Sequence, residues 1–323
     1  MRLTSAVSLV FALGLLWMPS AQASIPLNGT WMGSAERDRL QLSIRGTEEH
    51  GQIGLSLQRS ELKGLNTHDG PETSFRLEHE AGVLHFQGRF AGGKGAGHYR
   101  FEPNAAYVKE LAALGYTGIT PEEQLQLALF DVGPTRLRGL AELGYTKLSR
   151  EELFQVGIFN VTPEHIRAMK SAGFDKLSME QLVATRVHDV TPEHVQALKS
   201  AGYTQLSFED VLATSLHDVT PQHIQAMKSA GFDKLSLDDV LSTRIHGVTP
   251  ELIREVRALG FANATLDELV ALRIHGVTPA YIKEMREAGY PDVTLEQLVS
   301  MRIHGVDSGY VRGLSRGRKG QAK

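Results

Sequence analysis

A phrase of 29 residues recurs along this chain, and this repetition limits its fold more than any other feature. One position of the phrase is a column of glycines, namely Gly115, Gly144, Gly173, Gly202, Gly231, Gly260 and Gly289. A threonine recurs at the same interval at Thr162, Thr191, Thr220, Thr249 and Thr278. Fixed self-similarity of this kind is typical of solenoids, so we expect about seven repeats over residues 104–306.

Each repeat is expected to hold two short helices, called helix A and helix B. In the repeat that begins at Val161, Thr162 suits an N-cap and Pro163 suits the first helical position. Gly173 suits the left-handed residue that follows a helix, so helix A is predicted over about 163–172. A helix this short is unstable alone in water and must pack on its neighbours. We therefore predict an α-solenoid.

Helix B follows the same logic within each repeat. Ser178 and Gln181 have the spacing of a capping box at its start. The inward face is predicted to hold Met179, Leu182, Val183 and Val187. After helix B comes a column of residues that tolerate left-handed backbone: Asp131, Asn160, Asp189, Asp218, Gly247, Gly276 and Gly305.

Histidines recur at two positions of the phrase, and two interpretations compete for them. The first column reads Phe130, Phe159, His188, His217, His246, His275 and His304, and the second reads Tyr107, Arg136, His165, His194, His223, Leu252 and Tyr281. A metal site is the alternative at the junction of His188, Asp189, Glu193 and His194, all of which are competent ligands. Because few repeats carry this full set, we favour packing at helix ends and predict no metal or cofactor.

Residues 24–103 have a different residue pattern, in which apolar and polar residues alternate in short runs. The runs are 39–44, 52–57, 74–79, 83–90 and 97–103, with glycine-rich joins between them. This pattern predicts a small antiparallel sheet or partly closed barrel of five to seven strands. The fold class expected for the whole chain is therefore α+β, a β domain at 24–103 followed by the solenoid at 104–306.

Two motifs in the β domain superficially suggest chemistry. The run from His79 to His85 has its second histidine too late for an H-E-x-x-H zinc motif and is a predicted strand and turn. The glycine-rich run from Ala91 to His98 lacks the spacing of a phosphate loop, so we expect a hairpin turn. The sequence has no cysteine, which excludes disulfides and thiolate sites, and its net charge of −3 gives no support for nucleic-acid binding.

The two ends of the chain carry further signals. Residues 1–23 have a basic start, an apolar run and a small-x-small ending, which predicts a secretory signal peptide cleaved at about Ala23. We therefore expect an exported protein, periplasmic or secreted, with no transmembrane segment in the mature chain. Residues 307–323 are basic and are expected to form a frayed tail.

The phrases "GVTPELIREVRALGF" and "DELVALRIHGVTP", together with the β segment from Phe75 to Tyr116, resemble a module of exported bacterial proteins. In that module a small β segment precedes 29-residue helical repeats, and some relatives carry it behind a membrane metallopeptidase of the antibiotic-sensing type. The resemblance covers about 74–306 and implies no activity. The metallopeptidase portion is missing here, so proteolysis is not carried over. Association with a membrane sensor is what the resemblance suggests.

These observations favour a non-enzymatic scaffold or protein-binding module of the bacterial envelope, with no catalytic residue. Its predicted contact surface is a basic stripe on helix A comprising Arg167, Lys170, Lys199, Lys228, Arg254, Arg257, Lys283 and Arg286. One alternative is a ligand-binding or enzymatic β domain, with a pocket near His79, His85 or His98 and the repeats as a spacer. The other is metal binding through the repeated histidines.

Overall fold

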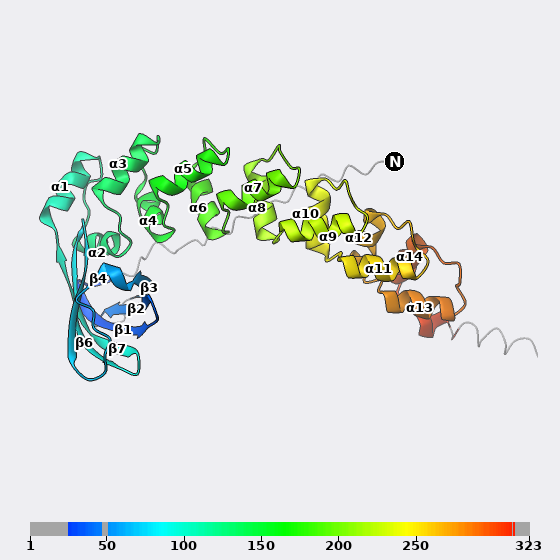
Figure 1. Ribbon diagram of the computed structural model, residues 1–323, viewed down its shortest axis with the longest axis horizontal. Coiled ribbons are helices and arrows are strands. Elements are labelled where there is room, and N and C mark those ends of the chain that lie inside the picture. Colours follow the sequence, from blue (N-terminus) through cyan, green and yellow to red (C-terminus); the bar gives the residue numbers. More distant parts are fainter. Residues whose placement is uncertain (1–24, 47–50, 312, 314–323) are drawn as a thin grey trace, which may run out of the picture. The chain divides into compact units, whose positions relative to one another are not determined.

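The computed structural model describes residues 25–46, 51–311 and 313 of the chain. This part contains seven strands and fourteen helices, and it divides into two compact units at Pro163 (Figure 1). The first unit holds the sheet and the first two repeats, and the second holds the later repeats. The predicted signal peptide at 1–23 and nearly all of the basic tail after Val311 lie outside the described residues.

The first unit is built on one antiparallel sheet, which confirms the predicted β domain. Its strands are β1 (Asn28–Ala35), β2 (Arg39–Gly46), β3 (Gln52–Gln58), β4 (Leu62–Lys63), β5 (Glu72–His79), β6 (Gly82–Ala91) and β7 (Lys94–Pro103). They lie in the order β3-β2-β1-β7-β6-β5-β4, and a 3₁₀ turn (Arg59–Glu61) joins the two edge strands. Strand β1 was not predicted, because its two glycines, Gly29 and Gly33, interrupt the alternation of side chains.

The core of the sheet is an aromatic cluster around Trp31 of β1. Its ring meets that of Phe75 edge-on, with centroids 5.3 Å apart, and Phe75 stacks on Phe86 at 4.7 Å. The indole Nε1 donates to the carbonyl of Gln87 at 3.1 Å, so the one polar atom of the ring is paired. Alternate residues of each strand therefore point into one shared core, as the period-two pattern requires.

Four helices complete the first unit: α1 (Ala105–Ala113), α2 (Pro121–Leu129), α3 (Pro134–Glu142) and α4 (Arg150–Ile158). Helix α2, the helix B of the first repeat, packs against β6 and β7. The buried Gln124 amide donates to the carbonyls of Ala81 and Asn104, at 2.6 and 2.9 Å. The first repeat is thus attached directly to one end of the sheet.

The second unit continues the repeats with alternating A and B helices. These are α5 (Pro163–Ser171), α6 (Met179–Val187), α7 (Pro192–Ser200), α8 (Phe208–Leu216), α9 (Pro221–Ser229), α10 (Leu237–His246), α11 (Pro250–Ala258), α12 (Leu266–Ile274), α13 (Pro279–Glu287) and α14 (Leu295–Ile303). Successive B helices contact one another from α8 through α14, and A helices α11 and α13 do the same. Repeated two-helix units confirm the predicted fold class. Within the part described, no helix is long and apolar enough to span a bilayer.

The caps that define the repeat are present. Ser178 and Gln181 form the expected capping box at the start of α6, and Thr191 accepts from the backbone N–H of His194 at the start of α7. Both left-handed columns are confirmed, and the seven glycines that follow helix A, from Gly115 to Gly289, have φ between 91° and 119°. The seven residues that follow helix B, from Asp131 to Gly305, have φ between 50° and 69°.

Candidate functional site

Three consecutive repeats of the second unit each contain one histidine–threonine bridge. The imidazole Nε2 atoms of His165, His194 and His223 lie 2.7, 2.9 and 2.8 Å from the hydroxyls of Thr185, Thr214 and Thr243. Each threonine hydroxyl donates its single proton to the backbone carbonyl three residues earlier. It must therefore accept from the imidazole, which assigns the proton of each ring to Nε2. The bridge ties helix A to helix B.

Burial governs the charge of these imidazoles. Desolvation lowers the pKa of His165, His194 and His223 below the usual value. The nearby Arg186 and Arg244 guanidinium groups lower the pKa of His165 and His223 further, while the Asp218 carboxylate opposes the shift at His194 and His223. Each ring is held neutral and bonded within the fold.

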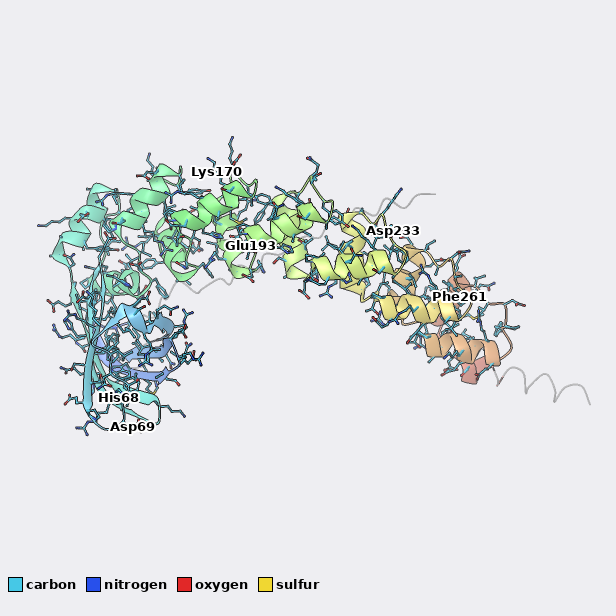
Figure 2. All side chains as sticks on the ribbon, viewed as in Figure 1. His68, Asp69, Lys170, Glu193, Asp233 and Phe261 are labelled. Atoms are coloured by element: carbon cyan, nitrogen blue, oxygen red, sulfur yellow. The ribbon has the colours of Figure 1, made fainter. Side chains whose placement is uncertain are left out.

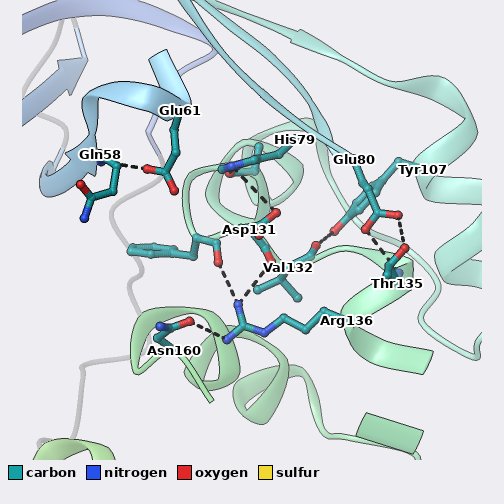
Figure 3. A network of polar contacts seen from close by, with 12 residues as sticks. Gln58, Glu61, His79, Glu80, Tyr107, Asp131, Val132, Thr135, Arg136 and Asn160 are labelled. Atoms are coloured by element: carbon teal, nitrogen blue, oxygen red, sulfur yellow. Dashed lines mark hydrogen bonds and ion pairs between the residues drawn. The ribbon is translucent and has the colours of Figure 1, made fainter. Parts of the chain in front are cut away.

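Other repeats use different side chains at the same position to join their helices. Figure 3 shows Tyr107, whose hydroxyl donates to the carbonyl of Val132 at 2.6 Å, and Arg136. Arg136 donates to the carbonyls of Val156 and Val161 of its own repeat, at 2.8 and 2.9 Å. In the last full repeat, the Tyr281 hydroxyl donates to the Val306 carbonyl at 2.6 Å. The column is therefore a structural joint that several residue types can fill.

The structure does not bring the candidate metal ligands at the His188–His194 junction into one site. His194 turns to Thr214, and among the described residues no three His, Asp or Glu side chains lie close enough to share an ion. In the first column, His304 turns back on the end of α14, where its Nδ1 lies 2.7 Å from the carbonyl of Ser300.

The histidines of the β domain lie in three different places. His79 lies 2.5 Å from the carbonyl of Ala128 at the end of α2, and His85 lies 3.2 Å from the Glu102 carboxylate across β6 and β7. His98 is exposed on β7. These positions do not combine the three rings into one pocket.

The sheet does carry an open cleft of about 1050 Å³, away from these histidines. Its walls come from β1, β2, β3, β6 and β7, and Met32, which is 57% exposed, lies in it. Small residues leave the cleft open beside Met32: Ser43 is its cross-strand partner on β2, and Gly54 is the partner of Ser43 on β3.

The predicted basic stripe separates into two groups in the structure. Arg167, Lys170, Arg254 and Lys283 are exposed, and Arg167 and Arg254 pair with Glu164 and Glu251 on their own helices. Lys199, Lys228, Arg257 and Arg286 are half-buried and donate to the carbonyls of Ala172, Ala201, Ala230 and Leu259. Each of these carbonyls ends helix A of the preceding repeat. The second group therefore caps helices.

Helix B has a matching set of caps between repeats. Ser215, Arg244 and Arg273 donate to the carbonyls of His188, His217 and His246, at 2.7, 2.9 and 3.0 Å. In both sets the donor lies 27 residues after its acceptor. Cations, and in one case the Ser215 hydroxyl, thus join the repeats at helix C-termini within the second unit.

An aliphatic residue at the last or next-to-last position of each helix B of the second unit forms an exposed row that sequence analysis missed. In the second unit the row comprises Val187, Leu216, Ile245, Ile274 and Ile303, which are 44–57% exposed. The prediction that Val187 faces inward was wrong. At 100° per residue, Val187 lies about 140° around the helix from the buried Leu182. The sequence signal that could have revealed this row is the recurrence of its aliphatic residues every 29 positions.

Three features thus stand out as places where the molecule could meet a partner: the exposed aliphatic row, the cleft at Met32 and the exposed cations of helix A. Figure 2 shows Lys170 and Asp233 among the side chains of the repeats. No family model matches this chain, and no curated protein matches it.

Proposed function

We propose that the chain is a non-enzymatic protein-binding scaffold that acts through the surface of its helical repeats. The aliphatic row formed by Val187, Leu216, Ile245, Ile274 and Ile303 carries this proposal. A single exposed aliphatic residue is ordinary. Five at the same position of five consecutive repeats form a regular apolar surface, and such surfaces are typical of interaction sites.

The bonding of the polar groups supports a structural rather than a catalytic role for the repeats. The imidazoles with lowered pKa are bonded to threonines, and the half-buried cations of helix A are bonded to carbonyls. Groups held this way link one helix to another. Among the exposed features of the repeats, the aliphatic row at the end of helix B is the partner surface that we propose.

The bacterial envelope is the proposed location, and the sequence of residues 1–23 is its support. The β domain would sit at the start of the exported chain. Mass spectrometry of the mature protein tests this part separately, with cleavage at about Ala23 as the expected result. Retention of the first 23 residues in the purified envelope fraction would contradict it.

Site-specific photo-crosslinking tests the binding role. A photoreactive residue at Ile245 or Ile274 should yield one defined adduct in intact cells, and one at exposed Gln225 on helix α9 should not. The adduct should disappear when the other residues of the row are replaced by glutamine. Equal crosslinking from Ile245 and Gln225 would contradict a specific partner surface.

The cleft at Met32 favours a second candidate function, binding of a small apolar ligand by the β domain. Replacing Gly54 by Leu would fill the cleft, since open space surrounds a side chain built at that position. If the cleft binds a ligand, native mass spectrometry of protein purified from its own host should show a bound mass that the Gly54→Leu variant loses.

A further inference from the structure

Each helix B of the second unit repeats one pattern of three residues along one side, of which the first and the last are exposed and the middle one is buried or half-buried. An acid at the second helical position is followed three residues later by an aliphatic residue and seven residues later by the exposed aliphatic row. In order the sets are Glu180, Val183, Val187; Glu209, Leu212, Leu216; Asp238, Leu241, Ile245; Asp267, Val270, Ile274; and Glu296, Val299, Ile303. The five acids are exposed. Residues at i, i+3 and i+7 share one helix face.

The first repeat shows how this face behaves when a neighbour is present. The equivalent residues on α2 are Glu122, Leu125 and Leu129, and the two leucines are 0% and 3% exposed. The contrast with the second unit lies at Leu129, which is buried on the helix that packs against β6 and β7, whereas the residues at its position in the second unit are 44–57% exposed. The chain therefore already uses this position of the repeat as a packing surface once, within the first unit.

The spacing of the row favours a helical partner. Packed helices lie about 8–10 Å apart, and α8, α10, α12 and α14 contact one another in succession. The aliphatic residues therefore recur at about that interval. Residues seven apart in an α-helix recur about every 10.5 Å. Residues two apart in a strand recur about every 6.6 Å and would fall out of register.

The charges beside the row define the flank of that partner. The acids lie two helical turns, about 10 Å, from the aliphatic residues and form a second row parallel to the first. Arg244 and Arg273, next to the aliphatic row, are already bonded to carbonyls, and Arg302 lies over the Tyr281 ring. The exposed acidic row attracts a basic flank and repels an anionic lipid surface.

We infer that the face from Val187 to Ile303 binds an amphipathic α-helix of a protein partner. The apolar residues of that helix recur about every seven positions, and lysine or arginine residues line the flank that meets Glu180, Glu209, Asp238, Asp267 and Glu296. This inference rests on the proposed scaffold function and adds the chemical class of the partner.

Two synthetic helices test it with the purified mature chain. Both carry leucine at seven-residue intervals, and their flanks carry lysine in one and glutamate in the other. Fluorescence anisotropy should show binding of the lysine peptide at least about tenfold tighter, weakening as salt rises. Equal affinity for both peptides would overturn the inference.

Matched variants assign the binding to the face. Ile245→Gln with Ile274→Gln should abolish binding, and Asp238→Asn with Asp267→Asn should remove the preference for lysine. Asp175→Asn with Asp233→Asn removes the same charge from exposed loops and should change nothing. Circular dichroism shows that each variant is folded. If the row variants bind as well as the parent, the inference fails.

Two other occupants of the face are outcomes of the same experiment. Tighter binding to vesicles of anionic phospholipid than to the lysine peptide, or self-association in sedimentation that Ile245→Gln with Ile274→Gln abolishes, would overturn the inference. The scaffold proposal is tested independently. A crosslinked partner with no such helix would end the inference alone, whereas crosslinking that is equal at Gln225 would end the scaffold proposal.

Discussion

The imidazole Nε2 of His194 lies 2.9 Å from the hydroxyl Oγ1 of Thr214, which follows it by 20 residues. The same pair of positions holds histidine and threonine in three repeats and holds Leu252 and Leu272 in another. The two positions therefore vary together within one chain. A polar joint in some repeats is replaced by an apolar joint in another.

This pairing predicts the effect of replacing one partner or both. Thr214→Leu alone should lower the free energy of unfolding by about 1–3 kcal/mol, because the His194 N–H loses its acceptor in a partly buried site. His194→Leu with Thr214→Leu should recover most of that loss, because it copies Leu252 and Leu272. Urea unfolding followed by circular dichroism measures both. A double variant less stable than the single one would contradict the pairing.

The bridges also predict that acid destabilises the repeats. Burial lowers the pKa of His165, His194 and His223 in the folded chain, while the unfolded chain keeps values of about 6.5. As pH falls below about 6.5, the imidazoles of the unfolded state bind protons, while those of the folded state stay largely neutral. Stability should therefore be lower at pH 5 than at pH 8.

The control for this pH dependence replaces the three histidines and their three threonines by leucine. Carboxylates contribute their own pH dependence to both proteins, so the informative quantity is the difference in melting temperature between parent and variant. The parent should lose more stability than the variant from pH 8 to pH 5. Parallel curves would show that the imidazoles titrate equally in the folded and unfolded states.

The caps between repeats predict a difference between removing a cation and exchanging it. Arg257→Met should cost about 1–2 kcal/mol, because the carbonyl of Ala230 loses a charged donor. Arg257→Lys should cost much less, because Lys199 and Lys228 make the same bond in other repeats. The buried Arg257 Nε has no hydrogen-bond acceptor among the described residues, so lysine forfeits no bond there.

Exposed Arg254, on the same helix, provides the comparison for that prediction. Its partner is Glu251 on the surface, and surface pairs contribute little. Arg254→Met should therefore change the urea midpoint far less than Arg257→Met. Equal losses from the two variants would mean that the effect comes from helix propensity or net charge and not from the cap.

The fold was largely predictable because the same signals for the start and the end of each helix recur in about seven repeats. Thr162, Pro163 and Gly173 mark helix boundaries through local chemistry, and local chemistry is visible in sequence. The histidine bridges and the caps between repeats were not predicted, because they join residues that are 20 and 27 positions apart. Which basic residues stay exposed depends on those contacts. For that reason the stripe predicted on helix A mixes exposed Arg254 with half-buried Arg257.

The left-handed positions predict opposite effects of glycine and other residues. Gly202 has φ +111°, and a side chain built there would meet no atom within 4 Å. Gly202→Val should still lower the free energy of unfolding by about 2 kcal/mol or more, because a β-branched residue resists this backbone conformation.

Asp189 has φ 52°, and Gly247 occupies the same position in a later repeat. Asp189→Gly should therefore be neutral or stabilise the fold by up to about 1 kcal/mol. Thermal melts of the two variants measure both effects. A shift of under about one degree for Gly202→Val would show that this glycine is not needed to end the helix.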